Sequence, residues 1–73
     1  MNHFFKVPLQ HSDMFIRSLD FNKGVIEYSI HTQDGGLLEP IKQSKFTESE
    51  TKIEFDGRFI AFDYAQHIAL TLQ

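Results

Sequence analysis

A chain of 73 residues forms one small domain and buries only about 60% of the surface that its unfolded form exposes, so we expect modest stability. It contains no cysteine, which excludes disulfides and thiolate metal sites and favours a reducing compartment. Seven basic and ten acidic residues give a formal net charge of −3. The basic residues are scattered among acids, so a nucleic-acid-binding surface is not expected. With no signal peptide and no apolar run of about 20 residues, we expect a soluble, cytoplasmic protein.

The aromatic content is high, with eight phenylalanines and two tyrosines. Each of these side chains buries on the order of 150–250 Å² in a protein core. A domain of this size cannot hide all of them. We therefore expect some aromatic surface to meet a protein partner or a second copy of the chain.

The first predicted strand runs from His3 to Leu9. Its apolar residues Phe5, Val7 and Leu9 alternate onto one face, as in a half-buried strand. Pro8 near the end of the run is typical of an edge strand or a strand terminus.

Residues 14–32 are predicted to form a hairpin that turns at residues 22–24. The register that best separates apolar from polar side chains pairs Phe21 with Ile26. The residues on its apolar face are then Phe15, Leu19, Phe21, Ile26, Tyr28 and Ile30. Arg17 is the one charged residue that this register places among them.

The same register puts Asp20 directly opposite Glu27. Like charges at this separation are destabilising. The pair is either a binding site for a cation or a basic partner, or a solvated pair whose side chains turn apart. A flat sheet surface offers no cleft that excludes water, so the pair does not predict catalysis.

Residues 33–50 are interpreted as a long loop within the domain. The sequence Gln33-Asp34-Gly35-Gly36 is a strong turn signal. Apolar residues are sparse in the rest of the segment, and Pro40 is expected to interrupt any long strand or helix.

A second hairpin, from Thr51 to Phe62, has Asp56-Gly57 at its centre. Asp-Gly favours a two-residue type I′ turn, whose length sets the pairing of the strands. The predicted pairs are Phe55 with Arg58, Glu54 with Phe59, Ile53 with Ile60, Lys52 with Ala61 and Thr51 with Phe62.

This register places Phe59 on a mixed face with Lys52, Glu54 and Ala61. A large apolar ring among charged side chains resembles the anchor of a protein interface with a polar rim. The alternative is a second small core in which Phe46 or Leu38 covers the ring.

The C-terminal segment has two interpretations. Ile68, Leu70 and Leu72 alternate with less apolar residues, which predicts a strand from residue 67 to residue 73. The alternative is a short helix with an apolar stripe that begins at Asp63.

The candidate metal ligand is His3. A free N-terminus with histidine at the third position can bind Cu(II) or Ni(II) in a square plane of nitrogen ligands. The alternative is a histidine at the start of a strand with no metal role. The other histidines do not follow the spacing of a zinc site.

Taken together, these patterns predict a mostly β domain: a small antiparallel meander of five or six strands, open or closed into a barrel, with a C-terminal helix as the alternative. No nucleophile motif or phosphate-binding loop is present, so we do not expect an enzyme or a bound cofactor. The expected function is a protein-interaction module, such as a small inhibitor or accessory subunit. It would bind through exposed aromatics, an acidic face (Asp20, Glu27) or a strand edge. The alternative is a small ligand- or metal-binding protein.

Overall fold

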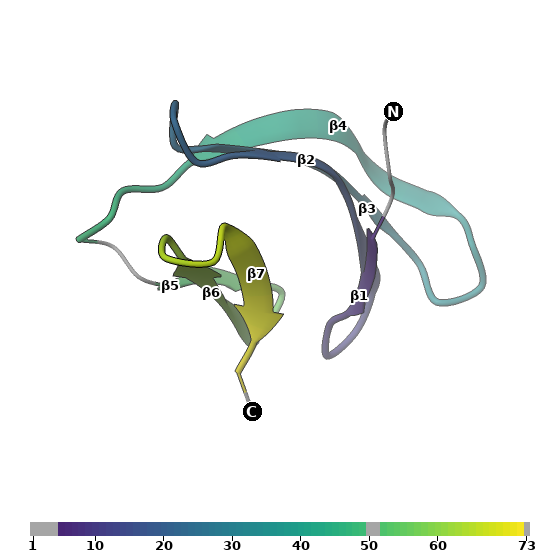
Figure 1. The fold of residues 1–73 in the computed structure, drawn as a ribbon. Helices are drawn as coiled ribbons and strands as arrows, with labels where there is room; N and C mark the ends of the chain where they lie inside the picture. Colours follow the sequence, from purple (N-terminus) through teal and green to yellow (C-terminus); the bar gives the residue numbers. More distant parts are fainter. Residues whose placement is uncertain (1–4, 50–51, 73) are drawn as a thin grey trace.

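The computed structural model describes residues 5–49 and 52–72, which contain seven strands and no helix. The strands are β1 (Phe5–Pro8), β2 (Asp13–Asp20), β3 (Val25–His31), β4 (Leu37–Lys45), β5 (Lys52–Phe55), β6 (Arg58–Asp63) and β7 (Ile68–Thr71). The first four form one antiparallel sheet in chain order, and the last three form a second (Figure 1). Within these residues, no helix is long and apolar enough to cross a membrane.

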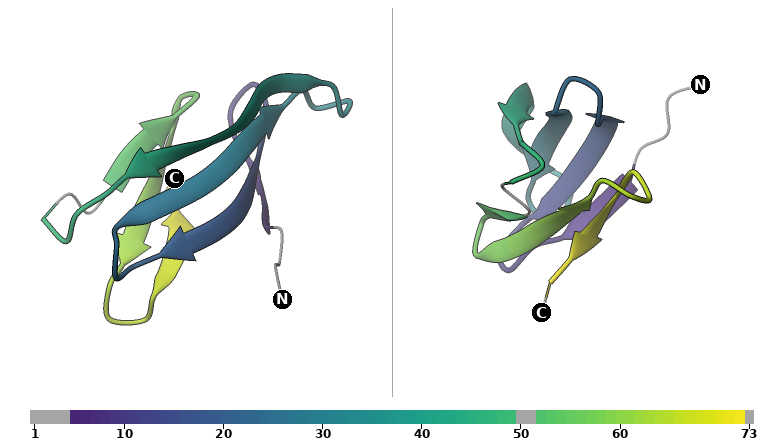
Figure 2. Two further views of the ribbon diagram at one scale, coloured as in Figure 1. Left: turned by 90° about the horizontal axis from the view of Figure 1, so that it is seen from above. Right: turned by 60° about the vertical axis from the view of Figure 1, so that its left-hand side comes forward.

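The two sheets face each other as two layers. The four-stranded sheet is curved, and the three-stranded sheet lies against its concave side (Figures 1 and 2). The core between them consists of Leu9, Met14, Ile16, Ile26, Tyr28, Ile30, Phe46, Phe55, Ile60 and Phe62. The prediction of a mostly β, antiparallel fold is confirmed. The strand number and the barrel were wrong, because the chain leaves β4 to start a separate sheet instead of continuing the first one.

Phe46, in the segment between the two sheets, is the aromatic centre of the core. It is 2% exposed. Its ring stacks on Phe62 of the second sheet with centroids 4.2 Å apart, and meets Phe21 of the β2–β3 loop edge-on at 5.2 Å. Its backbone N–H donates to the carbonyl of Gly24 at 2.8 Å. The connection between the sheets is therefore itself part of the core.

The β5–β6 hairpin has the predicted register. Phe55 pairs with Arg58, and Glu54 pairs with Phe59. Asp56 and Gly57 have φ of 42° and 80°, as a type I′ turn requires. The predicted Thr51 pair lies outside the described residues. Here the turn residues and the alternation specify the same pairing.

The β2–β3 hairpin differs from the prediction. Leu19, instead of Phe21, pairs with Ile26, and the register shifts between Ile16 and Ser18. This bulge at Arg17 reverses the alternation, so residues on the core side have even numbers before it and odd numbers after it. Met14 and Ile16 are buried as a result, whereas Phe15 faces outward.

The loop expected over residues 33–50 is mostly strand. Residues 33–36 do form the predicted turn, but β4 follows and pairs with β3 along most of its length. The register shifts on both sides of Ile30, and Pro40 lies in this irregular part of the ladder. A proline is tolerated there because β4 is an edge strand, where one face of the backbone needs no hydrogen-bond partner.

The C-terminal segment is a strand, as its alternation predicts. β7 pairs antiparallel with β6, and Leu72 extends the pairing by donating its N–H to the carbonyl of Phe59 at 2.9 Å. The helical alternative was wrong. Asp63 instead ends β6, and its carboxylate accepts the N–H of Gln66 in the turn before β7.

Candidate interaction surface

The outer face of the β5–β6–β7 sheet points away from the core. Because Ile53, Phe55, Ile60 and Phe62 turn inward, the strand alternation turns their neighbours outward. The outward residues are Lys52, Glu54, Phe59, Ala61, Asp63, Ile68, Leu70 and Leu72. We call this set the outer face. Its centre is apolar and its margins carry charges.

The large apolar side chains of the outer face are open to solvent. Phe59, Ile68, Leu70 and Leu72 are 41%, 37%, 48% and 40% exposed, respectively. Leu72 lies beside Phe59 through their backbone hydrogen bond, and Leu70 pairs with Ala61. These side chains form one continuous patch across β6 and β7, whereas single exposed apolar residues would need no explanation.

Phe59 occupies the position that the sequence predicts. It shares the outer face with Glu54, its cross-strand partner, and with Lys52, whose Nζ lies 5.0 Å from the centre of the ring. A cation at this distance is attracted by the face of the ring. Phe46 is buried in the core between the sheets, and Leu38 belongs to β4 of the other sheet, so the second small core does not form.

The predicted acidic pair does not form. Ser18, instead of Asp20, lies opposite Glu27, and Asp20 pairs with Val25. The Asp20 carboxylate accepts the N–H of Lys23 at 2.9 Å and so stabilises the β2–β3 loop. The prediction failed because it assumed a regular ladder and did not allow for the bulge at Arg17.

Glu27 has basic and polar neighbours within the sheet. Its carboxylate lies 3.5 Å from Nε of Arg17 and accepts a hydrogen bond from the side chain of Gln43 at 3.3 Å. The bulge thus places Arg17, the misfit of the predicted register, beside a carboxylate. Both acids contribute to the first sheet, and the structure does not bring them together.

His3 lies outside the described residues. Among the described residues, no group of three or more histidine, aspartate or glutamate side chains is arranged to hold a metal ion.

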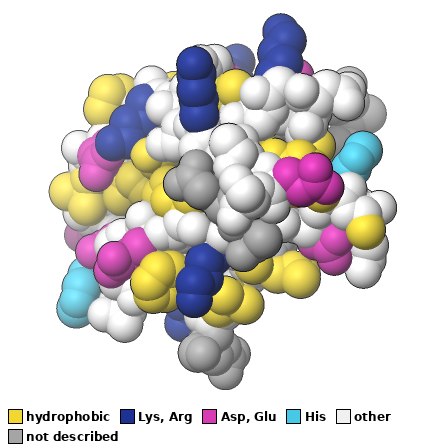
Figure 3. All heavy atoms as spheres, turned by 90° about the vertical axis from the view of Figure 1, so that its left-hand side faces the viewer, with side chains coloured by type: hydrophobic (Ala, Val, Ile, Leu, Met, Phe, Trp, Pro, Cys, Tyr) yellow, Lys and Arg dark blue, Asp and Glu magenta, His cyan; other side chains and the backbone are white. Residues whose placement is uncertain are grey.

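Charges of both signs and apolar side chains alternate on the side of the molecule drawn in Figure 3, and neither sign dominates that view.

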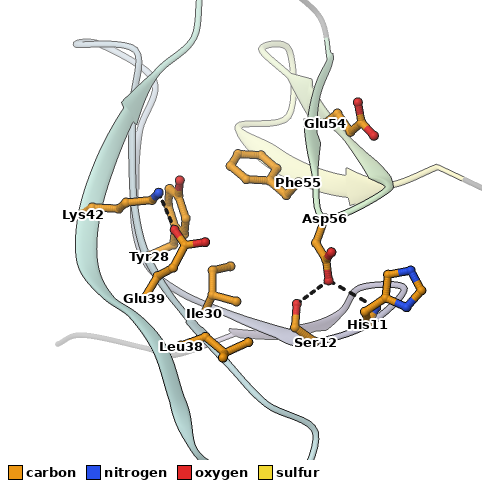
Figure 4. Close-up of a pocket in the computed structure, with 10 residues that line it drawn as sticks. All are labelled: His11, Ser12, Tyr28, Ile30, Leu38, Glu39, Lys42, Glu54, Phe55 and Asp56. Atoms are coloured by element: carbon orange, nitrogen blue, oxygen red, sulfur yellow. Dashed lines mark hydrogen bonds and ion pairs between the residues drawn. The ribbon is translucent and has the colours of Figure 1, made fainter.

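A cleft of about 410 Å³ opens between β4 and the β5–β6 hairpin (Figure 4). Asp56 lies at one end, where its carboxylate accepts hydrogen bonds from Ser12 Oγ at 2.6 Å and from the backbone N–H of His11 at 3.2 Å. The His11 ring points away from this carboxylate. A nucleophilic triad needs the imidazole between serine and carboxylate, so these residues join the two sheets and do not activate the hydroxyl.

The other end of the cleft carries an ion pair between Lys42 and Glu39. The hydrogen bond to the Glu39 carboxylate, with the nearby Tyr28, holds the pKa of Lys42 above its usual value. The amine is therefore protonated at neutral pH and is not a nucleophile. Within the cleft, intramolecular partners occupy the Asp56 and Glu39 carboxylates, the Ser12 hydroxyl and the Lys42 amine.

The sequence indicates Phe59 as an exposed interface residue, but it does not show that the side chains of β7 lie beside it. The alternation of Ile68, Leu70 and Leu72 in the sequence shows that these three residues share one face of a strand. It does not show which face of the sheet that is. Only the pairing of β7 with β6 places them beside Phe59. No protein-family model, curated protein or solved structure matches the chain.

Proposed function

We propose that this chain is a non-catalytic protein-interaction module that binds a partner through the outer face of the β5–β6–β7 sheet. The observation that supports the proposal is the uncovered apolar patch formed by Phe59, Ile68, Leu70 and Leu72. The inward side of the same sheet already supplies the core, so the patch is not needed to hold the two layers together.

The composition of the outer face resembles the anatomy of a protein interface. Such interfaces place aromatic and aliphatic anchors at the centre and polar groups at the rim. Phe59 is the proposed anchor. Lys52 packs over its ring, while Glu54 and Asp63 stand at the margins of the sheet. With a chain charge of −3, the complementary partner is an apolar surface bordered by basic side chains.

The proposed binding surface does not include the acidic residues Asp20 and Glu27, and the proposed function has no catalytic step. The carboxylates of Asp20 and Glu27 have hydrogen-bond partners within the first sheet and lie away from the outer face. The cleft residues Ser12 and Asp56 join the sheets. With no cysteine in the chain, we place the module in a reducing compartment such as the cytoplasm.

The test is recovery of a partner from a lysate of the source organism by the wild type, Phe59→Asp and Leu37→Asp. Leu37 of β4 is 62% exposed and provides the matched control on the other sheet. We expect a stoichiometric partner whose recovery falls about tenfold or more with Phe59→Asp, as for an interface anchor, and stays within about twofold with Leu37→Asp.

Thermal melting of both variants checks that each is folded. Equal recovery by the wild type and Phe59→Asp would contradict the proposed face. The absence of any stoichiometric partner on the wild type would contradict the function.

A further inference from the structure

The two sheets have four edge strands, β1 and β4 in the first and β5 and β7 in the second. An unpaired edge presents backbone N–H and C=O groups that another strand can join. Natural proteins prevent this pairing with prolines, bulges and charged residues on the edge. Comparing the edges shows which of them is left open for pairing.

The β1 edge is protected by a proline. Leu9 donates its N–H to Ser12, and hydrogen-bonded and non-bonded pairs alternate along an antiparallel ladder. Val7 therefore directs its backbone groups to β2, whereas Lys6 and Pro8 direct theirs outward. Pro8 has no N–H to offer, so a further strand cannot pair regularly there.

The β4 and β5 edges are protected in other ways. β4 contains Pro40, two register shifts and two lysines. In β5 the same alternation, counted from the two-residue turn, directs the backbone of Lys52 and Glu54 outward. The two β5 residues whose backbone groups point to the open edge are therefore both charged.

The β7 edge has none of these features. Residues 68–72 contain no proline, glycine or charged residue, and the pairing with β6 is regular. Because Leu72 donates to Phe59, Leu70 and Ile68 also direct their backbone groups to β6. Ala69 and Thr71 direct theirs outward, away from the sheet.

A groove lies beside this edge. An apolar groove of about 440 Å³ runs between β1 and β7, and core residues of β2 line its floor. Six of its lining residues are apolar, among them Val7, Leu19 and Ala69, and the other two are Lys6 and His67. A strand added to β7 would cover the groove with the side chains that it turns inward.

We propose that β7 pairs antiparallel with β7 of a second copy, about a two-fold axis at Leu70. Ala69 then faces Thr71 of the second copy, and these pairs exchange their outward backbone hydrogen bonds. Leu70 faces Leu70 of the second copy as a non-bonded pair, in which side chains are closest. Ile68 meets Leu72 of the second copy on the same side.

A second copy can pair with this edge because residues 68–72 carry no charge. Two chains of charge −3 repel each other, so self-association requires a contact without like charges. The paired residues of β7 carry no charge, and their register satisfies the two-fold rule: Ala69 of each copy meets Thr71 of the other, and Leu70 meets Leu70. It also joins the two outer faces into one larger apolar surface, which would make the module bivalent.

The contact is small, so we expect a weak dimer. One pair of short strands and its flanking side chains fall below the roughly 1,200 Å² of a standard interface. The mass should therefore rise from one chain to two between about 1 μM and about 1 mM. Sedimentation equilibrium over this range measures the change directly.

Two proline variants locate the edge. Thr71→Pro removes an outward N–H of β7 without breaking the β6 ladder, as Pro8 does naturally in β1. Glu54→Pro is the matched change in β5. We expect the dissociation constant to rise about tenfold or more for Thr71→Pro and to stay near the wild-type value for Glu54→Pro.

A charge exchange tests the two-fold axis. Leu70→Lys and Leu70→Glu should each be monomeric alone, and their mixture should form a one-to-one heterodimer, because the proposed axis places residue 70 against itself. Leu70 is half exposed, so both variants should fold. A wild type that stays monomeric to about 1 mM, equal loss with Glu54→Pro, or a mixture that stays monomeric would each overturn the proposal.

Failure of this proposal is separable from failure of the proposed function. Phe59 lies on β6, away from the paired edge, so Phe59→Asp should lose the partner and keep the dimer. Thr71→Pro, whose side chain is not on the outer face, should lose the dimer and keep the partner. Loss of the dimer with Phe59→Asp would contradict the proposed axis.

Discussion

The two hairpins of this small domain reach their registers by different routes. In β5–β6, the turn Asp56-Gly57 is two residues long and both have positive φ, so local geometry alone sets the pairing. In β2–β3, four residues separate the paired Asp20 and Val25. A loop of that length permits several registers, and packing on the second sheet decides among them.

Phe21 shows how that decision is made. Keeping Phe21 in the ladder would separate apolar from polar residues best, yet the structure places it in the loop. There its ring meets Phe46 and Tyr64 edge-on and stacks on His67, with centroids 5.1–5.2 Å apart. A tight turn therefore sets the register of a hairpin independently of its surroundings, whereas the register of a hairpin with a longer loop depends on tertiary contacts.

Phe46→Ala should destabilise the domain more than any other substitution considered below. This substitution removes the ring between the sheets and leaves a cavity, with an expected loss of about 3–5 kcal/mol in the free energy of unfolding. In a domain of marginal stability this is a large fraction of the total. Urea denaturation measures it, and Phe59→Ala on the outer face is the control.

If tertiary contacts hold the β2–β3 register, the loss should greatly exceed that of the control. Equal losses would contradict the role of Phe46 as the centre of the core between the sheets.

The next largest losses of stability are expected for alanine substitutions at one glycine in each of the two hairpin turns. A Cβ at Gly24 (φ 69°) would lie 2.3 Å from the carbonyl oxygen of Phe46, a backbone atom that cannot move freely, whereas one at Gly57 (φ 80°) would meet the flexible side chain of Gln10. We expect Gly24→Ala to cost about 2–3 kcal/mol and Gly57→Ala about 1 kcal/mol. Thermal or urea unfolding gives both values.

A larger loss for Gly57→Ala than for Gly24→Ala would mean that the β2–β3 loop accommodates a side chain more easily than the two-residue turn. That result would contradict the expected dependence of the β2–β3 loop on its contact with Phe46. Gly35→Ala is a reference for strain alone, because a Cβ there meets nothing within 4 Å at a φ of 100°.

The smallest effect is expected for Asp56→Asn. Asparagine also tolerates positive φ, so the turn should persist, but the charged acceptor for Ser12 Oγ and the His11 N–H becomes a neutral one. We expect a loss of about 0.5–1.5 kcal/mol, measured by urea unfolding. Ser12→Ala should bring the wild type and Asp56→Asn closer together, and a loss that is unchanged in the Ser12→Ala background would show that this bond does not stabilise the domain.

The residues predicted for the candidate site differ in the same way as the two hairpins: a tight turn sets the positions of some of them, and tertiary contacts set the positions of the others. Phe59, Lys52 and Glu54 share a face because the Asp56-Gly57 turn sets their register, so the sequence was sufficient to group them. Asp20 and Glu27 belong to the hairpin whose loop does not set the register, and their predicted opposition failed there. Leu70 and Leu72 join Phe59 only through the β6–β7 pairing, across a turn at His67 with φ 56°, which the sequence does not signal clearly.

Local turn chemistry and alternation, which can be read from the sequence, are enough to specify the β class, the β5–β6 hairpin with its register, the turn over residues 33–36 and the strand character of the C-terminus. Contacts between distant segments produce the bulge at Arg17, the strand through Pro40 and the division into two layers. Those features depend on burial. A side chain such as Phe46 takes its place only when both sheets are present to enclose it, and no local pattern contains that information.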